Sequence, residues 1–284
     1  MRGSIHNSMR FSDLLRPLLP SSPPGKVIAL VGGGGKTTAM FALAEEFSAD
    51  GHDVLMTTTT HIADPRDEPD RSFDHLWLDP AAVADPAQIP KTAAGRGRRC
   101  VLAGSDAADA GKLKGIDPEQ LTTLRHVWPF ILVEADGAKR KPIKAPAAYE
   151  PVLPPTADLV LGLIGLDALG RACGTDTVHR PEHFSQITGC PPGTPIGLDH
   201  LARLATAPDG LFKQVPPATP RVLVLNKADR SPLPLPEVLD ALEDSVSRCA
   251  ELIVITTLAE RDPEQRVHAQ RPLVCCHFPG DLAS

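Results

Sequence analysis

The stretch VIALVGGGGKTT, residues 27–38, decides how this chain is expected to fold. Its first five residues form a continuous apolar run, which is typical of a strand buried in a parallel sheet. Four glycines then lead into residues 37–49, where apolar residues recur at helical spacing until Asp50 and Gly51 end the pattern. The sequence therefore predicts a buried strand, a tight glycine turn and a helix.

The turn in this unit has the composition of a phosphate-binding loop. Glycines allow backbone N–H groups to close around phosphate oxygens, and the helix N-terminus adds the positive end of its dipole. In such loops the lysine reaches the β- and γ-phosphates and the following threonine ligates Mg²⁺. The predicted nucleotide-phosphate site consists of Gly32, Gly33, Gly34, Gly35, Lys36, Thr37 and Thr38.

This loop is shorter than the GxxxxGK[ST] pattern, because the first glycine of that pattern would fall on Leu30. The shorter form G-x-x-G-K-T resembles the loop of Mur-type peptide ligases as much as that of ordinary P-loop nucleoside triphosphatases. An ATP-dependent ligase is therefore one alternative, although no separate substrate-binding domain is evident in the 284 residues.

Strands and helices are expected to alternate along the rest of the chain. Apolar runs predict strands at 53–57, 130–133, 159–164, 222–225 and 252–256. Helices are predicted from residue 117 and over 182–187, 198–205 and 236–246. This alternation predicts an α/β fold, a three-layer arrangement with a mainly parallel sheet like that of P-loop nucleoside triphosphatases, in which ligands bind beyond the carboxyl ends of the strands.

Two segments stand outside this pattern. Residues 1–8, MRGSIHNS, resemble the remnant of an expression tag, which leaves a single domain over residues 9–284. Residues 62–99 are rich in Asp, Pro and Ala with little periodicity, so we expect a surface excursion there, with one short strand near 76–78.

Composition excludes several classes of protein. Hydrophobic residues make up 42% and charged residues 23% of the chain, as in ordinary globular proteins. The net charge of −6 argues against a general attraction to nucleic acid or to an anionic membrane. Six scattered cysteines do not form a disulfide scaffold. We expect a cytoplasmic protein that binds neither nucleic acid nor membrane.

Two acidic residues follow the strand predicted at 130–133. Glu134 and Asp136 are two positions apart, so they share a face at the carboxyl end of that strand. Carboxylates in this place hold Mg²⁺, directly or through water, or orient a nucleophile. We predict Lys36, Glu134 and Asp136 as catalytic residues and Thr37, Glu134 and Asp136 as Mg²⁺ ligands, and the division of work between the two carboxylates stays open.

The strand predicted at 222–225 ends in Asn226-Lys227-Ala228-Asp229, which matches the pattern NKxD. A carboxylate at this position accepts two hydrogen bonds from guanine, which adenine does not supply, while the lysine stem covers the base. Asn226, Lys227 and Asp229 are therefore the predicted base-binding residues. The pattern favours GTP, with ATP as the alternative.

Other polar clusters follow predicted strands. A threonine after the second strand would complete the Mg²⁺ shell or contact the γ-phosphate, although β-branched residues also occur where a strand enters a turn. Cations after Glu134 would bind phosphate charge or an anionic second substrate, unless they form a solvated face. The predicted substrate-binding residues are Thr58, Thr59, Thr60, His61, Lys139, Lys144, His179 and Arg180.

With these residues identified, the chain resembles the YqeC family of selenium-dependent molybdenum hydroxylase accessory proteins, also described as selenium cofactor biosynthesis proteins. The resemblance lies in five blocks that follow in order between residues 27 and 229, namely VGGGGKTTAMFALA, VLMTTTTHI, ILVEADGAKRKPIKAPAAYEPVLP, VHRPEHFSQITG and APDGLFKQVPPATPRVLVLNKAD. It implies a P-loop fold and a role in maturing selenium-containing molybdenum hydroxylases, and all the predicted site residues except Lys227 are matched positions.

Two kinds of function follow from the resemblance. The first is an enzyme that binds Mg²⁺ with GTP or ATP and phosphorylates, activates or hydrolyses during maturation of the cofactor. The second is a chaperone whose nucleotide state controls docking to a molybdenum hydroxylase or a selenium carrier protein.

Overall fold

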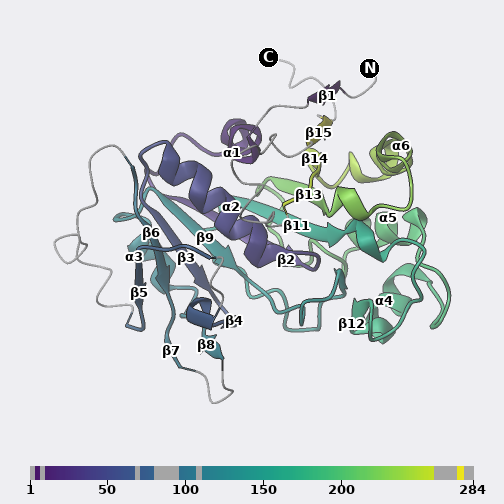
Figure 1. Cartoon of the computed structure of the whole chain (residues 1–284), viewed down its shortest axis with the longest axis horizontal. Helices are drawn as coiled ribbons and strands as arrows, with labels where there is room; N and C mark the ends of the chain where they lie inside the picture. The colour runs from purple at the N-terminus through teal and green to yellow at the C-terminus, as the bar shows by residue number, and fades with distance from the viewer. Residues whose placement is uncertain are drawn as a thin grey trace.

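A ten-stranded sheet forms the centre of the protein in this computed structural model (Figure 1). The structure describes residues 4–6, 10–67, 71–79, 96–106, 111–258 and 274–277. The strand order is β1-β15-β14-β13-β11-β2-β9-β3-β6-β5, and the eight strands from β14 to β5 are parallel. The predicted three-layer α/β class is confirmed, while the likeness to P-loop nucleoside triphosphatases stays a prediction.

The strands of this sheet include every strand expected from the sequence. They are β1 (Ser4–His6), β2 (Lys26–Gly32), β3 (Val54–Thr58), β5 (His75–Trp77), β6 (Arg99–Leu102), β9 (Phe130–Glu134), β11 (Leu159–Gly165), β13 (Arg221–Asn226), β14 (Leu252–Ile255) and β15 (Val274–His277). Two small sheets lie beside it: β10 (Ile143–Lys144) with β12 (Val178–His179), and β4 (His61–Ala63) with β8 (Lys112–Lys114) and β7 (Ser105–Asp106).

Helices cover both faces of the sheet. They are α1 (Phe11–Leu15), α2 (Lys36–Ala49), α3 (Gln120–Leu124), α4 (Pro181–Thr188), α5 (Leu198–Thr206) and α6 (Leu235–Val246), with short 3-10 turns at Arg16–Leu18, Pro65–Asp67, Leu166–Ala168 and Ala228–Arg230. In the part of the chain that the structure describes, no helix is long and apolar enough to cross a membrane.

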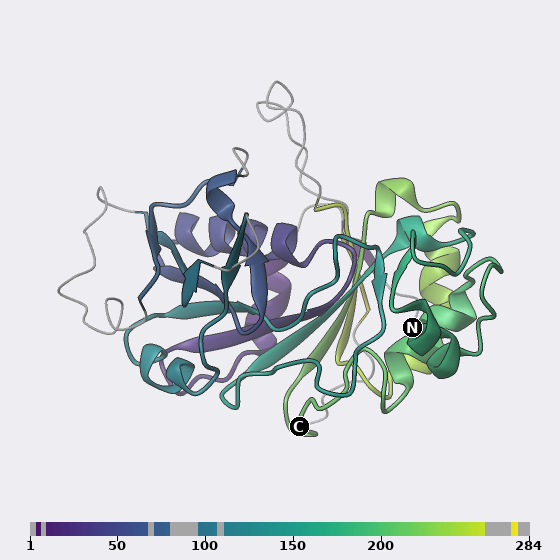
Figure 2. The ribbon, with the colours of Figure 1, turned by 90° about the horizontal axis from the view of Figure 1, so that it is seen from below.

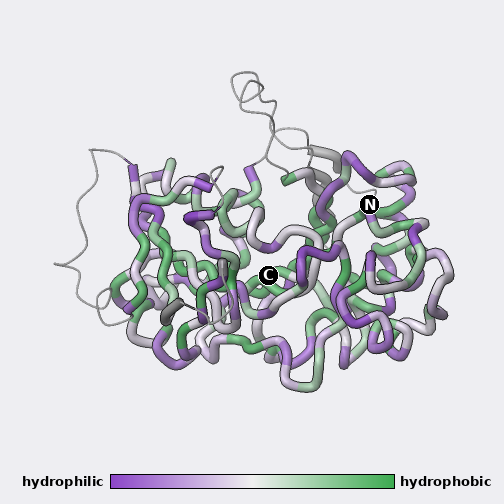
Figure 3. Tube along the Cα trace, turned by 60° about the horizontal axis from the view of Figure 1, so that its bottom comes forward, coloured by the Kyte–Doolittle hydropathy of each residue, from purple (hydrophilic) through white to green (hydrophobic). Residues whose placement is uncertain are grey.

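Strand β2 shows how the sequence builds the layers. Ile28 and Leu30 pack with α1 and α2 on one face, because successive side chains of a strand alternate. Ala29 and Val31 face the helices α4 to α6, and Val27 packs with α3. Helices α4 to α6 gather at one end of the molecule and the β3–β8 region lies at the other (Figures 1 and 2). Figure 3 shows apolar strand segments, in green, running through the interior.

The topology brings three polar strand ends, at Thr58, Glu134 and Asn226, to one edge of the sheet. Strand β2 lies between β11 and β9, and Glu134 at the end of β9 is in register with Leu30 of β2 and Thr58 of β3. On the other side of β2, Asn226 at the end of β13 is in register with Gly165 of β11. The phosphate loop therefore has acidic residues on one side and the NKxD residues on the other.

The two segments set aside in the sequence contribute to the sheets. Ser4–His6 pairs antiparallel with β15. Within residues 62–99, the expected short strand is confirmed as β5, which pairs with β6, and Ile62 in β4 is buried. Residues 68–70 and 80–95 lie outside the described part of the chain.

Candidate functional site

The glycines of the phosphate loop are packed against the protein on their outer side. The N–H of Gly33 donates to Leu163 O and that of Gly34 to Lys141 O, both at 2.9 Å. Gly34 has a φ of +76°, and a Cβ there would lie 2.2 Å from the nitrogen of Gly165. No side chain fits this position, so glycine is required both by the backbone conformation and by the close approach of β11.

The first turn of α2 supplies the donors of the site. The first helical hydrogen bond runs from the N–H of Ala39 to Gly35 O, and no side chain caps the helix. The amides of Lys36, Thr37 and Thr38 precede that bond and have no intrahelical acceptor. These residues line a cleft of about 750 Å³, so the positive end of the helix dipole faces a space large enough for a ligand.

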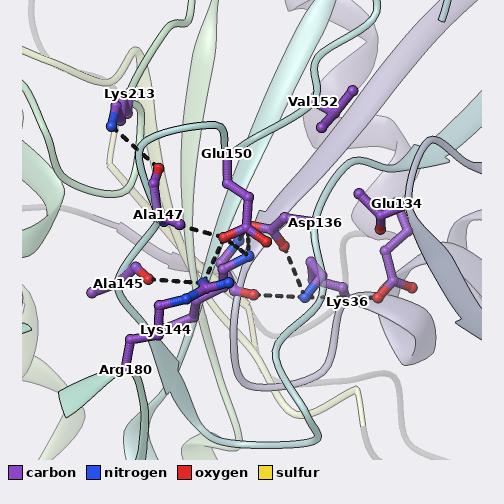
Figure 4. A network of polar contacts seen from close by, with 12 residues as sticks. Lys36, Glu134, Asp136, Lys144, Ala145, Ala147, Glu150, Val152, Arg180 and Lys213 are labelled. Atoms are coloured by element: carbon purple, nitrogen blue, oxygen red, sulfur yellow. Dashed lines mark hydrogen bonds and ion pairs between the residues drawn. The ribbon is translucent and has the colours of Figure 1, made fainter. Parts of the chain in front are cut away.

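Lys36 is held by carboxylates in this structure. It is only 4% exposed, and its Nζ lies 3.1 Å from Asp136 Oδ1, 3.7 Å from Glu134 Oε1 and 2.6 Å from the carbonyl of Gly32 (Figure 4). Burial alone lowers the pKa of Lys36, but the attraction of Asp136 and Glu134 outweighs burial and raises that pKa. The lysine is therefore charged and already paired.

The two carboxylates occupy different positions. Glu134 lines the cleft, and the hydroxyl of Thr37 donates to its Oε2 at 2.8 Å. Burial raises the pKa of Glu134 despite the nearby Lys36. Asp136 is buried behind the loop, where its Oδ2 accepts from the N–H of Gly32 at 3.0 Å. Burial raises the pKa of Asp136, but Lys36 and Lys144 outweigh it and lower that pKa.

These positions favour Glu134 over Asp136 as a metal ligand. Among the described residues, no group of three His, Cys, Asp or Glu side chains could hold a metal ion. The hydroxyl of Thr37 and the carboxylate of Glu134 are oxygen donors of the kind that Mg²⁺ prefers, and Mg²⁺ commonly uses one or two such groups with water and substrate phosphates. The donor set fits that ion.

A chain of alternating charges continues from Asp136 into the protein (Figure 4). Lys144 is fully buried, and its Nζ lies 3.1 Å from Asp136 Oδ2 and 3.0 Å from Glu150 Oε2. Arg180 donates to the same Glu150 oxygen at 2.5 Å. Glu134, Lys36, Asp136, Lys144, Glu150 and Arg180 thus alternate in sign, and we call this set the ion-pair chain.

The ion-pair chain changes the interpretation of two predicted substrate-binding residues. Neither Lys144 nor Arg180 lines the cleft. Pairing of β10 with β12 places Lys144 beside His179, and burial lowers the pKa of Lys144 although two carboxylates oppose that effect. These two cations have a structural role, because Lys144 pairs with Asp136 and Glu150, and Arg180 pairs with Glu150.

His179 lies in a positive environment. Burial, followed by the charges of Arg180, Lys144 and Lys139, lowers its pKa from 6.5 to about 4, and Glu150 opposes them. His179 is therefore neutral at pH 7. It does not line the cleft.

The pKa of His179 predicts that acid destabilises the protein. Between about pH 6.5 and pH 4 the unfolded chain binds a proton at this residue that the folded chain does not, so stability falls as the pH is lowered through that window. We expect His179→Gln to lose less stability than the wild type over that interval, measured by urea unfolding at both ends. Equal losses in the two proteins would contradict this assignment.

The threonines at the end of β3 join this strand end to neighbouring segments. The buried hydroxyl of Thr58 donates to Glu134 O at 2.8 Å, and that of Thr59 to Val152 O at 2.7 Å. The hydroxyl of Thr60 lies 3.4 Å from that of Thr58. None of the three lines the cleft, whereas His61 does. Of Thr58, Thr59, Thr60 and His61, only His61 lines the cleft, and Lys139 is the other predicted substrate-binding residue that does.

The NKxD residues are tied to the phosphate loop. Asn226 Nδ2 donates to Gly34 O at 2.8 Å, and its Oδ1 accepts from the N–H groups of Lys227 and Leu258. Lys227 lines the cleft and its Nζ pairs with Asp167 at 2.8 Å. Asn226 therefore sets the distance between the loop and the residues that follow β13.

Asp229 is exposed and is oriented by a residue that the sequence analysis missed. The hydroxyl of Thr257 accepts from the N–H of Asp229 and donates to Asp229 Oδ1, both at 3.2 Å. The signal that could have found Thr257 was a polar residue directly after the strand predicted at 252–256. Asp167 and Glu150 were also missed, because their roles depend on partners 60 and 30 residues away.

The cleft is also lined by residues from segments without recognisable periodicity. Its described lining comprises Gly34, Gly35, Lys36, Thr37, Thr38, His61, Ile62, Ala63, Arg71, Gly111, Lys112, Glu134, Gly137, Ala138, Lys139, Arg140, Lys141 and Lys227. Arg71 and Lys112 carried no signal in the sequence, since neither follows a predicted strand.

Comparisons with known proteins support one family. A family model described as YqeC protein matches residues 28–182, a range that contains the phosphate loop and the whole ion-pair chain. The uncharacterized protein YqeC of Escherichia coli (strain K12) is 37% identical over 205 residues, which cover 71% of this chain and 75% of that protein. No solved structure gives a significant match. The chain belongs to the YqeC family.

Proposed function

We propose that the protein binds a nucleoside triphosphate with Mg²⁺ and transfers or hydrolyses its terminal phosphoryl group. The observation that carries this proposal is the contact of 2.8 Å between the Thr37 hydroxyl and the Glu134 carboxylate. It lies at the start of α2, where Lys36, Thr37 and Thr38, whose amides have no side-chain cap, line the cleft. Hydrogen-bond donors for an anion and two oxygen ligands suited to Mg²⁺ therefore lie at the same point.

The residues around the phosphate loop have separate roles in this proposal. The amides of Lys36, Thr37 and Thr38 donate to phosphate oxygens, and the Lys36 ammonium turns from the carboxylates toward the β- and γ-phosphates. Asp136 keeps Lys144 and the N–H of Gly32 when Lys36 moves away, so its buried charge stays compensated. Mg²⁺, held by Thr37 and Glu134, would neutralise charge on the transferred group.

We propose guanine as the preferred base. Asp229 presents a carboxylate held by Thr257, and guanine offers it two N–H donors that adenine lacks. Lys227, two residues before Asp229, lines the cleft, and Asn226 joins the backbone of Lys227 to Gly34. ATP remains the alternative nucleotide.

The cellular role is proposed from the family resemblance. We propose that nucleotide turnover serves the maturation of the selenium-containing molybdenum cofactor of hydroxylases, with a molybdenum hydroxylase or a selenium carrier as the protein partner. A nucleotide-switched chaperone differs from an enzyme in one measurable property. It turns nucleotide over slowly alone and faster with its protein partner, whereas a phosphotransferase or ligase needs its small-molecule acceptor.

Calorimetric titration with non-hydrolysable GTP and ATP analogues tests this proposal. We expect Mg²⁺-dependent binding, with GTP preferred by about tenfold or more, because a lost pair of hydrogen bonds to a carboxylate costs about 1.5–3 kcal/mol. Asp229→Asn should remove the preference and leave ATP binding unchanged. Asp240→Asn, an exposed aspartate in α6, serves as the matched control. Binding of neither nucleotide would refute the proposed function, and equal GTP and ATP affinities in the wild type would refute only the choice of base.

A further inference from the structure

Lys227, which lines the cleft after β13, is fixed at both ends in this structure. Its N–H donates to Asn226 Oδ1 at 2.8 Å, and its Nζ lies 2.8 Å from Asp167 Oδ2. Its backbone has a φ of 61°, in the left-handed region that residues with a Cβ rarely adopt. A lysine side chain has many rotamers when nothing holds its end. These contacts therefore order a side chain that would otherwise be mobile in the cleft.

Asp167 follows the strand next to that of Lys227. It lies in the 3-10 turn after β11, two residues beyond Gly165, which is in register with Asn226 of β13. The ion pair therefore joins the carboxyl ends of two neighbouring strands, which are about 4.8 Å apart. Because the backbone of Lys227 is at the end of β13 and its ammonium group is beside the residue that follows β11, its stem lies across the space between these strand ends.

The carboxylate of Asp167 is itself confined. Its side chain is only 16% exposed. A Cβ on Gly165 would lie 2.5 Å from Asp167 Oδ1 and 3.3 Å from the Cα of Gly34, so glycine at position 165 leaves the space that the carboxylate occupies beside the phosphate loop. Asp167 is not among the described residues that line the cleft, whereas Lys227 is. Any effect of Asp167 on a bound ligand therefore passes through Lys227.

We propose that Asp167 is a positioning residue of the base-binding site, which holds the Lys227 stem in place as the surface that the nucleotide base covers. The inference rests on the proposed function, in which this stem contacts the base. A stem that Asp167 has already ordered loses less conformational entropy when the nucleotide binds. The apolar stem contacts the face of either base, so Asp167 contributes to the affinity for GTP and ATP alike, whereas Asp229 discriminates between them.

Calorimetry on the full chain with Mg²⁺ tests this inference, with non-hydrolysable GTP and ATP analogues and inorganic tripolyphosphate as the ligands. We expect Asp167→Ala to weaken binding of both nucleotides by about twofold to tenfold, which is the usual effect of having to order one long side chain on binding. The affinity for tripolyphosphate should not fall, because this ligand has no base. Asp209→Ala is the matched control, since it breaks another Asp–Lys ion pair, with Lys213 at 3.6 Å, outside the described cleft lining.

A second comparison tests whether Asp167 acts through Lys227. The stem is absent in Lys227→Ala, so adding Asp167→Ala to that variant should cause no further loss of nucleotide affinity relative to tripolyphosphate. Thermal unfolding of each variant controls for loss of the fold. Asp167→Asn keeps the shape of the side chain and removes its charge, so it carries the test if Asp167→Ala does not fold.

The three ligands separate the outcomes. Equal weakening of tripolyphosphate and nucleotides in Asp167→Ala would show that Asp167 supports the phosphate loop, and a loss of GTP affinity alone would make it a base-discriminating residue. Either result would overturn the inference, as would unchanged nucleotide affinity or a loss that persists without Lys227. A wild type that binds nucleotides no more tightly than tripolyphosphate would overturn it as well. A wild type that binds no nucleotide would refute the proposed function first, and this inference with it.

Discussion

Replacing Lys36 by alanine is expected to weaken nucleotide binding by about 100-fold or more. The substitution removes the only ammonium group that the phosphate loop itself provides, and charged hydrogen bonds to two phosphates contribute about 3 kcal/mol together. Calorimetric titration of wild type and Lys36→Ala with the preferred nucleotide and Mg²⁺ measures the effect.

The same substitution also acts on the carboxylates. Glu134 loses its nearest cation, while Asp136 keeps Lys144 and the N–H of Gly32. The pKa of Glu134 should therefore rise further than burial already raises it. Thermal unfolding of Lys36→Ala controls for loss of the fold. Lys26→Ala controls for loss of charge, because Lys26 begins strand β2, which leads into the phosphate loop, and lies outside the cleft lining. A folded Lys36→Ala protein with unchanged affinity would refute the phosphate-loop assignment.

The second large effect is expected at Lys144, in stability. Lys144→Met should lower the free energy of unfolding by about 3 kcal/mol, because removing one partner of a buried ion pair leaves charge uncompensated. The loss falls at the lower end of the usual range of about 3–5 kcal/mol, since Asp136 keeps Lys36 and Glu150 keeps Arg180. Urea unfolding at pH 7 measures it.

Two further variants test whether the ion-pair chain is the cause. Lys141→Met should change stability by no more than about 0.5 kcal/mol, because Lys141 is only half-buried and the hydrogen bond of its side chain, to Asp176 O, is long at 3.4 Å. Glu150→Gln combined with Lys144→Met should cost less than the sum of the single changes by about 1 kcal/mol or more, as expected of directly paired groups. Additive effects, or a Lys144→Met protein as stable as wild type, would show that Lys144 does not compensate these carboxylates.

The outcome at individual residues shows how far the sequence predicts the site. Spacing placed Glu134 and Asp136 on one face at a strand end, and both contact Lys36 in the structure. Spacing did not separate their roles, because the difference arises from Lys144, which reaches Asp136 from β10. The two-residue strands β10 and β12 carry no periodic signal, so their pairing was not predicted.

The threonines show the same limit. A run of four threonines at the end of a strand is compatible with both ligand binding and a structural role, and only the acceptors of their hydroxyl groups distinguish the two. Thr58 and Thr59 donate to carbonyl oxygens of Glu134 and Val152, residues more than 70 positions away in the chain. Such partners depend on how strands are ordered in the sheet, which local patterns do not specify.

The sequence by itself determined the buried parallel strands, the glycine loop that joins one of them to a helix, and the polar residues at the carboxyl ends of those strands. Each of these follows from local chemistry: apolar periodicity, the missing Cβ of glycine, and the alternation of side chains along a strand. Tertiary structure alone decided which polar residues face the cleft and which compensate one another in the interior. Burial and ion pairing act through distance in space, so Lys144 became a support for the phosphate loop and Lys112 part of the cleft wall.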